Sequence, residues 1–229
     1  MNAYAPDLIK VLEIIWVNII LSGDNAVVIA MACRGLPPSR QRMGMILGAG
    51  VAVVLRVVFT AVIAFLLATP FLKIVGGLLL LWIAVKLVTD EEGDGSGIAE
   101  TDRLWHAIRT VAIADAVMSL DNVLAIAAVA KDSTYLLVLG LAISIPLIVA
   151  GASIIIKVLE KLPVLVWAGA ALLGWIGGDM LVSDPFVIGQ IGQHMAELIE
   201  LPASIAGAAL VLALAWFIRQ RRRSRPAGA

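Results

Sequence analysis

Long apolar runs constrain this chain more than any other feature of its sequence. Each is about 20 residues long, the length at which an α-helix rising about 1.5 Å per residue crosses roughly 30 Å of hydrocarbon. Seven such runs can be marked, at residues 8–33, 43–68, 71–89, 106–130, 134–156, 162–182 and 201–218. A soluble fold cannot bury so many helices that are apolar on all sides. The sequence therefore predicts an all-α, polytopic membrane helix bundle with seven transmembrane helices.

The composition agrees with a membrane protein. Hydrophobic residues make up 61% of the 229 residues and charged residues only 15%, whereas soluble domains carry roughly a quarter charged residues. The net charge is zero, and we expect no nucleic-acid partner. The single cysteine, Cys33, excludes an intrachain disulfide and a thiolate cluster. The first apolar run contains Glu13 and Asp24 and follows no basic segment, so we do not expect a cleaved signal peptide.

Basic residues predict the orientation in the membrane, because short loops rich in Lys and Arg stay in the cytoplasm. The C-terminal tail is basic, with Arg219, Arg221, Arg222, Arg223 and Arg225. Counting back through seven spans places two further basic loops, 34–42 and 157–161, on the same side as this tail. We therefore expect a multi-pass protein with its N-terminus outside and its C-terminus in the cytoplasm.

The sequence contains an internal duplication. Residues 14–34 align with residues 111–131, and both copies share a Ser-x-Asp-Asn motif at 22–25 and 119–122. Asn18 in the first copy aligns with Asp115 in the second. Further alignment pairs Pro70, Gly76 and Trp82 with Pro163, Gly169 and Trp175. Hydrophobicity alone does not generate shared polar residues, so we interpret the likeness as a genuine duplication.

Each copy holds three spans, an odd number, so the second copy crosses the membrane in the reverse sense. Inverted repeats of this kind are common in secondary transporters, whose substrate sites lie at the repeat interface. We assign residues 1–89 to the first three-helix repeat, 90–105 to an acidic cytoplasmic linker, 106–182 to the second, inverted repeat, and 183–229 to an interfacial segment, a seventh helix and the basic tail. Within the last segment, Asp184-Pro185 is a helix-start signal.

Carboxylates and amides interrupt the apolar runs near their centres. A charged side chain in mid-membrane costs at least about 2.5–3.5 kcal/mol on insertion scales, so it is retained only when paired, hydrated or functional. The inverted topology predicts two oxygen-rich tiers, Asp24 with Asp115 and Asn18 with Asp121, roughly 8–10 Å apart along the helix axes. Asn25 and Asn122 flank these tiers.

These side chains offer only oxygen ligands. Hard or borderline divalent cations such as Mn²⁺, Mg²⁺ and Ca²⁺ suit such a set, whereas Zn²⁺ and Cu⁺ prefer nitrogen or sulfur. The predicted metal site comprises Asp24, Asp115, Asp121, Asn18, Asn25 and Asn122, with the hydroxyls of Ser22 and Ser119 as secondary ligands. The alternative is a polar network that only holds helices together, as Asn and Ser do in many membrane proteins.

Three further charged residues have two interpretations each. Arg56, in the second run, either neutralises the empty site and leaves when metal binds, or forms a fixed ion pair. Glu13 is either an entry ligand or a solvated interfacial residue. Asp179 either lines an outer gate or reaches the membrane surface.

The paired motifs Asn-x-x-x-Ser-x-Asp-Asn at 18–25 and Asp-x-x-x-Ser-x-Asp-Asn at 115–122 resemble those of the TerC family of bacterial integral membrane proteins, particularly its short YjbE-like members. The likeness covers the first six spans. It implies a bacterial inner (cytoplasmic) membrane, export of Mn²⁺, and essential roles for the intramembrane acidic residues, here Asp24, Asp115 and Asp121.

We therefore expect a transporter that exports divalent cations, Mn²⁺ first among them, by alternating access. Proton antiport is a plausible coupling, since a buried carboxylate can exchange a proton for a metal ion. The alternatives are a Ca²⁺ transporter and a membrane-protein assembly factor with a structural polar network. We expect no enzymatic activity, because the Asp contexts lack the Gly-x-Gly-Asp of intramembrane aspartyl proteases, and no prosthetic group. Gly76, Gly77 and Gly169 would permit close helix packing, either within the chain or in a homodimer.

Overall fold

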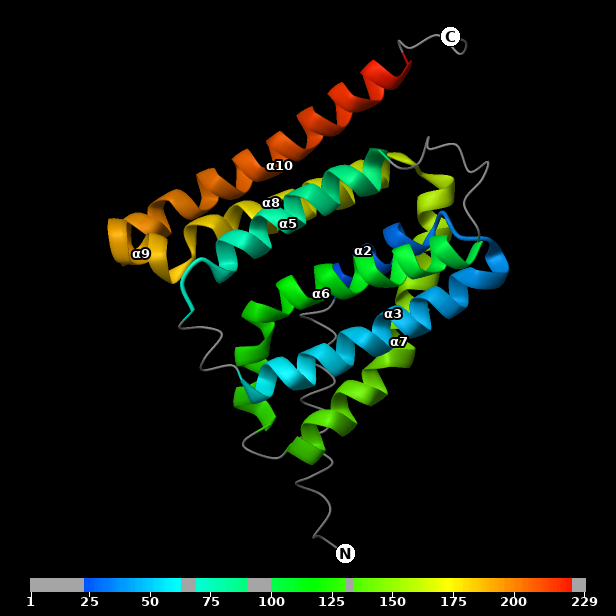
Figure 1. Ribbon diagram of the computed structural model, residues 1–229, viewed down its shortest axis with the longest axis horizontal. Coiled ribbons are helices and arrows are strands. Elements are labelled where there is room, and N and C mark those ends of the chain that lie inside the picture. The colour runs from blue at the N-terminus through cyan, green and yellow to red at the C-terminus, as the bar shows by residue number, and fades with distance from the viewer. Residues whose placement is uncertain (1–22, 63–68, 90–99, 131–133, 224–229) are drawn as a thin grey trace, which may run out of the picture. The chain divides into compact units, whose positions relative to one another are not determined.

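The computed structural model of the chain describes residues 23–62, 69–89, 100–130 and 134–223, and the regular structure in these ranges is α-helical (Figure 1). The described helices are α2 (Gly23–Cys33), α3 (Pro38–Ala61), α5 (Leu72–Thr89), α6 (Glu100–Ala130), α7 (Thr134–Lys161), α8 (Val164–Val182), α9 (Pro185–Ile191) and α10 (Gln193–Arg223). Each of the seven predicted runs contains at least part of one of these helices.

Four of the described helices are long and apolar enough to cross a membrane. Their apolar segments are Pro38–Phe59, Leu72–Thr89, Val164–Val182 and Gln193–Arg221. The described part of the chain therefore has the character of a helical membrane protein, as predicted. The full count of seven spans and the inverted repeat stay predictions.

Two helices begin earlier than the apolar pattern indicates. Helix α6 begins at Glu100, inside the segment 90–105 that was expected to be a linker. Acidic residues near a helix N-terminus are favourable, which explains why Glu100 and Asp102 join the helix. Helix α10 begins at Gln193, ahead of the apolar run 201–218, because Gly192, at a φ of 82°, ends α9 and turns the chain directly into α10.

Contacts between helices divide the chain into two compact units. The first unit covers residues 1–68 and 99–160, and the second covers residues 69–98 and 161–229. Among the described helices, α2, α3, α6 and α7 belong to the first unit, and α5, α8, α9 and α10 to the second. Each unit thus draws helices from both halves of the predicted duplication. The assignment of residues 1–89 and 106–182 as repeats concerns sequence ancestry, and it stays a prediction.

In the first unit, α6 packs against both α2 and α3. Gly48 of α3 lies against Val111 of α6, since a Cβ atom on Gly48 would lie 3.1 Å from the Val111 side chain. The small residues Ala49 and Ala52 of α3 and Ala114 of α6 are buried. The opposite side of α3 exposes apolar residues such as Val54, which is 62% exposed. An exposed apolar helix face is expected where the neighbour is lipid.

In the second unit, α8 packs against both α5 and α10, and Figure 1 shows these three helices side by side. Glycines let their backbones approach closely. A Cβ atom on Gly77 of α5 would lie 2.6 Å from the carbonyl oxygen of Gly177 in α8. The close packing predicted for Gly77 is therefore made within the chain, and a homodimer stays a prediction.

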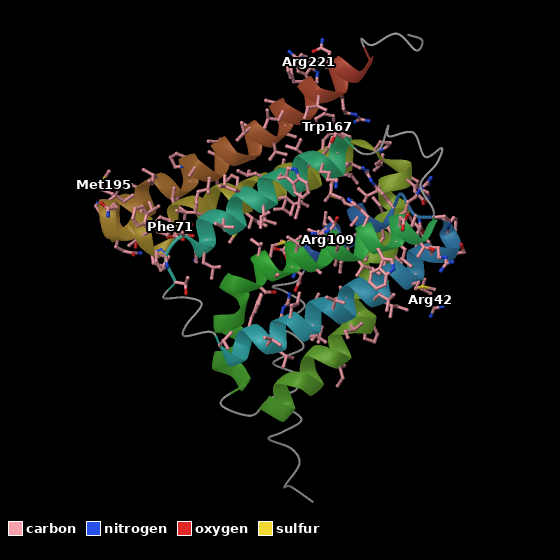
Figure 2. The ribbon with its side chains drawn as sticks, in the orientation of Figure 1. Arg42, Phe71, Arg109, Trp167, Met195 and Arg221 are labelled. Atoms are coloured by element: carbon pink, nitrogen blue, oxygen red, sulfur yellow. The ribbon has the colours of Figure 1, made fainter. Side chains whose placement is uncertain are left out.

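The junction between α5, α8 and α9 is built around Asp184, which has an exposed fraction of 0%. Its side chain accepts a hydrogen bond from the backbone N–H of Phe186 in α9, as the Asp-Pro helix-start signal predicted. The same carboxylate also accepts from backbone N–H groups at the start of α5. Figure 2 shows Phe71 at this end of α5, and its ring lies 4.4 Å, centroid to centroid, from that of Phe186.

Candidate functional site

The described residues of the duplicated motif meet inside the first unit, where α2 packs against α6. Helix α2 contributes Asp24 and Asn25 from the first copy, and α6 contributes Asp115 and Ser119 from the second. Arg56 of α3 completes the group. All five side chains lie in a predominantly apolar interior: Asp24 is half-buried, and the other four are buried.

Arg56, Asp115 and Ser119 form a closed ring of hydrogen bonds. The Nη2 atom of Arg56 donates to Oδ1 of Asp115 over 2.7 Å, and its Nε donates to Oγ of Ser119 over 3.1 Å. The Ser119 hydroxyl in turn donates to Oδ2 of Asp115 over 3.1 Å. Both oxygens of Asp115 are thus occupied. Arg56 and Asp115 thus form an ion pair, which both interpretations of Arg56 include, and the choice between a displaceable and a fixed pair stays a prediction.

Asn25 differs from its neighbours because neither atom of its side-chain amide has a hydrogen-bond partner among the described residues. Its exposed fraction is only 3%. An unsatisfied buried polar group costs about 1–3 kcal/mol, so such groups in folded proteins commonly serve a bound water, ion or substrate. The Asn25 amide can therefore offer an oxygen to a ligand without giving up a hydrogen bond to any described residue.

A cavity of about 10 Å³ lies beside this amide. It is lined by Asn25, Arg56 and Asp115 and otherwise by apolar residues, Ile29, Ala49, Ala52, Val53 and Ile148. This volume corresponds to roughly one water molecule. The cavity thus places three polar side chains of the cluster around a space of small-ion or water size.

Asp24 is the second acidic residue of the cluster. Its Oδ1 accepts a hydrogen bond from the backbone N–H of Asn25 over 2.8 Å. It lies close enough to Arg56 and to Asp115 for the charges of both residues to act on it. Asp24 and Asp115, which the inverted topology predicts at one depth, are therefore electrostatic neighbours.

Several residues of the predicted site are not part of this description. Glu13, Asn18 and Ser22 precede the described residues, and the side chains of Asp121 and Asn122 also lie outside them. Within the described ranges, no group of three or more His, Cys, Asp or Glu residues is arranged to hold a metal ion. The six-residue metal site therefore stays a prediction.

Asp179 is the candidate gate residue. It is half-buried near the C-terminal end of α8 and belongs to the second unit, whereas the polar cluster belongs to the first. Its role at a gate stays a prediction.

The role of Ser119 was missed in the sequence, where it was treated only as a secondary ligand. Ser119 follows Asp115 by four residues, and residues with this spacing share one face of an α-helix. That spacing could have indicated that the hydroxyl bonds the carboxylate.

Comparisons with known proteins agree with the membrane character of the chain. The model of the family described as "Integral membrane protein TerC family" matches residues 4–224. The chain is 42% identical to the Bacillus subtilis protein described as "Uncharacterized membrane protein YjbE", over 82% of this chain and 85% of that protein. It is 27% identical to YceF of the same organism, also an uncharacterized membrane protein, over 70% of this chain and 66% of YceF.

A third relative, the uncharacterized membrane protein YkoY of Bacillus subtilis, is 26% identical over 75% of this chain and 61% of YkoY. No solved structure matches the chain significantly. The family match spans almost the whole sequence, and the apolar helices are those of a multi-pass membrane protein. The chain therefore belongs to the TerC family of integral membrane proteins.

Proposed function

We propose that this protein is a transporter that exports divalent metal cations, Mn²⁺ in particular, and not an enzyme. The observation that carries the proposal is the buried Asn25 amide, which has no hydrogen-bond partner among the described residues and lies beside Asp24 and Asp115. Membership of a membrane family supports it, because acidic residues inside a bilayer are rare and commonly mark ion or proton pathways.

The chemistry of the cluster favours a hard or borderline cation. Asp24 supplies a carboxylate and Asn25 an amide oxygen. The sequence predicts three further ligands, the carboxylate of Asp121 and the amides of Asn18 and Asn122. Oxygen donors of this kind suit Mn²⁺, Mg²⁺ and Ca²⁺. Alternating access of the two inverted repeats about this site, with protons moving in the opposite direction, is the mechanism we propose.

The orientation is part of the proposal. The guanidinium of Arg219 in α10 lies 5.5 Å from the ring centroid of Trp167, near the start of α8, and Arg221 stacks on Phe217. Basic and aromatic residues together are typical of a membrane surface. We assign this end of the second unit to the cytoplasmic surface of a bacterial inner membrane.

A structural polar network is the second candidate, and the Arg56–Asp115–Ser119 ring favours it. A ring in which each group satisfies another can hold helices together without any substrate. It leaves the Asn25 amide unexplained, however, and therefore ranks second.

Metal-dependent stability separates the two candidates. Mn²⁺ should raise the unfolding temperature of the purified protein in detergent, because a ligand at 100 times its Kd stabilises the folded state by about 2.7 kcal/mol. The measurement is a thermal unfolding series with Mn²⁺, Mg²⁺ and Ca²⁺ at equal ionic strength. Equal midpoints with and without each metal would favour the structural network.

Removal of the Asp24 charge should abolish export. Asp24→Asn keeps the size of the side chain but removes its charge, and we expect Mn²⁺ efflux from cells to fall at least about tenfold, since even indirect supports of a metal site are worth about 10–100-fold. The matched control is Asp102→Asn, the same change at an exposed position of α6. Efflux at the wild-type rate by an Asp24→Asn protein present at normal amounts would refute the assignment of Asp24.

A further inference from the structure

The three long helices of the second unit are packed antiparallel, with α8 against both α5 and α10. In both pairs, successive contacts run in opposite directions along the two helices: Gly77 with Leu181 and Leu81 with Gly177 between α5 and α8, and Gly174 with Gly207 and Gly178 with Ala203 between α8 and α10. The C-terminal ends of α5 and α10 therefore lie at the same end of the unit as the start of α8. Figure 2 shows Trp167 and Arg221 toward this end and Phe71 and Met195 toward the other.

Charged residues are sorted between these two ends. The acidic residues in the described part of this unit all lie within residues 179–200, where α8 finishes and α10 begins. The opposite end, which we call the basic end, carries Lys86 of α5, Lys161, which precedes α8, and Arg219 and Arg221 of α10. Residues 201–218 of α10 contain no charge and separate the two groups by about 27 Å at 1.5 Å per residue. This separation matches the roughly 30 Å between the two surfaces of the bilayer hydrocarbon.

Two cations of the basic end lie over exposed aromatic rings. The Nζ atom of Lys86 is 5.0 Å from the ring centroid of Trp82, and the guanidinium carbon of Arg221 is 4.4 Å from that of Phe217. Trp82 is 56% exposed and Phe217 is 45% exposed. A positive charge beside an exposed ring matches the region of a phospholipid where the phosphate joins the acyl chains. A soluble anion would use the charges but leave the rings in water.

We propose that the basic end binds the phosphate headgroup of an anionic phospholipid such as phosphatidylglycerol, with the acyl chains against the exposed rings. The described residues of this unit place no carboxylate at this end. Each Lys or Arg near an anionic membrane surface strengthens the attraction roughly fivefold. The inference depends neither on the transport function nor on the orientation of the chain in the membrane. In the sequence, acidic residues at 90–94 follow α5, and they are the competing source of negative charge.

The experiment titrates phosphatidylglycerol into the purified protein in a non-ionic detergent and follows the unfolding midpoint. The midpoint should rise until binding saturates, because a ligand of the folded state stabilises it, and phosphatidylcholine should give a much smaller rise. The double variant Arg219→Gln with Arg221→Gln should weaken the apparent affinity for phosphatidylglycerol about 25-fold, or about fivefold for each charge.

Two control variants accompany this measurement. Arg219→Lys with Arg221→Lys keeps both charges and should remain within about threefold of the wild-type affinity. Lys73→Gln removes one positive charge at the opposite end of α5, and it should also remain within about threefold. Inorganic phosphate at equal ionic strength tests whether the anion must belong to a lipid.

Equal rises with phosphatidylglycerol and phosphatidylcholine would overturn the inference, because the basic end would then be neutralised by carboxylates of the protein itself. Stabilisation by inorganic phosphate as large as that by phosphatidylglycerol would overturn it in favour of a soluble anion. Wild-type affinity in the double Gln variant would overturn the assignment to this end. If that variant is not recovered, Arg221→Gln alone, at an exposed position, should lose about fivefold in affinity, and an unchanged affinity would have the same consequence.

Discussion

Replacement of Asp184 by alanine is expected to lower the free energy of unfolding by about 4 kcal/mol or more, since hydrogen bonds to a charged group contribute about 1.5–3 kcal/mol each. The Asp184 carboxylate accepts from four backbone N–H groups. Oδ1 accepts from Phe71 over 3.0 Å and from Phe186 over 2.8 Å. Oδ2 accepts from Lys73 over 3.0 Å and from Ile74 over 3.4 Å. One side chain therefore caps the first turns of both α5 and α9.

The backbone of Phe71 increases the expected loss. Phe71 has a φ of 65°, a left-handed conformation that costs about 1–3 kcal/mol for a residue other than glycine. The hydrogen bond from its N–H to Asp184 helps to hold this conformation, and so does the contact between the rings of Phe71 and Phe186. Without the carboxylate, the first turns of α5 and α9 and the strained residue that precedes α5 lose their common support.

Thermal unfolding in detergent measures this effect. A loss of this size should lower the unfolding midpoint by about 10 °C in a chain of this length. Asp184→Asn should fall between the wild type and Asp184→Ala, because its amide oxygen can accept while its NH₂ group faces backbone donors. The control is Glu197→Gln, an exposed change on α10. A midpoint for Asp184→Ala equal to that of this control would contradict the double cap.

Asp184 also shows which parts of the fold can be predicted from sequence. Its cap on α9 is a local feature, written in the Asp-Pro pair, and the structure confirms it. Its cap on α5 joins residues 113 positions apart, and no local pattern indicates such a partner. The apolar runs are also features of neighbouring residues in the sequence. For this reason each predicted run contains at least part of a described helix.

Helix pairing was harder to predict because helices that are apolar on all sides have no strongly preferred face. The same reason explains why Arg56 had two interpretations in the sequence. Its partner Asp115 is 59 positions away, and whether the two residues can meet depends on which helices are neighbours. The repeat indicated that Asp24 and Asp115 are related, but only coordinates show that Ser119 and Arg56 occupy both Asp115 oxygens while the Asn25 amide lacks a described partner.

Introduction of a side chain at Gly178 is expected to force α8 and α10 apart. A Cβ atom there would overlap the carbonyl oxygen of Ala203 and lie 2.9 Å from its carbonyl carbon. One helical turn away, a Cβ on Gly207 would overlap the carbonyl oxygen of Gly174. Small residues at four-residue spacing on both helices, Gly174 and Gly178 facing Ala203 and Gly207, thus bring the two backbones into direct contact.

Gly178→Leu should therefore destabilise the protein by about 3 kcal/mol or more, at or beyond the upper range for overpacked interiors, because rigid backbone atoms oppose the new side chain. Gly178→Ala should show a smaller loss in the same direction. The matched control is Gly151→Ala in α7, where a Cβ meets nothing within 4 Å; removal of a helical glycine there should leave stability unchanged or raise it by up to about 1 kcal/mol. Thermal unfolding of the three variants measures the order. If Gly178→Leu unfolds at the same temperature as Gly151→Ala, α8 and α10 do not pack through these glycines, because a branched side chain cannot occupy a contact already filled by backbone.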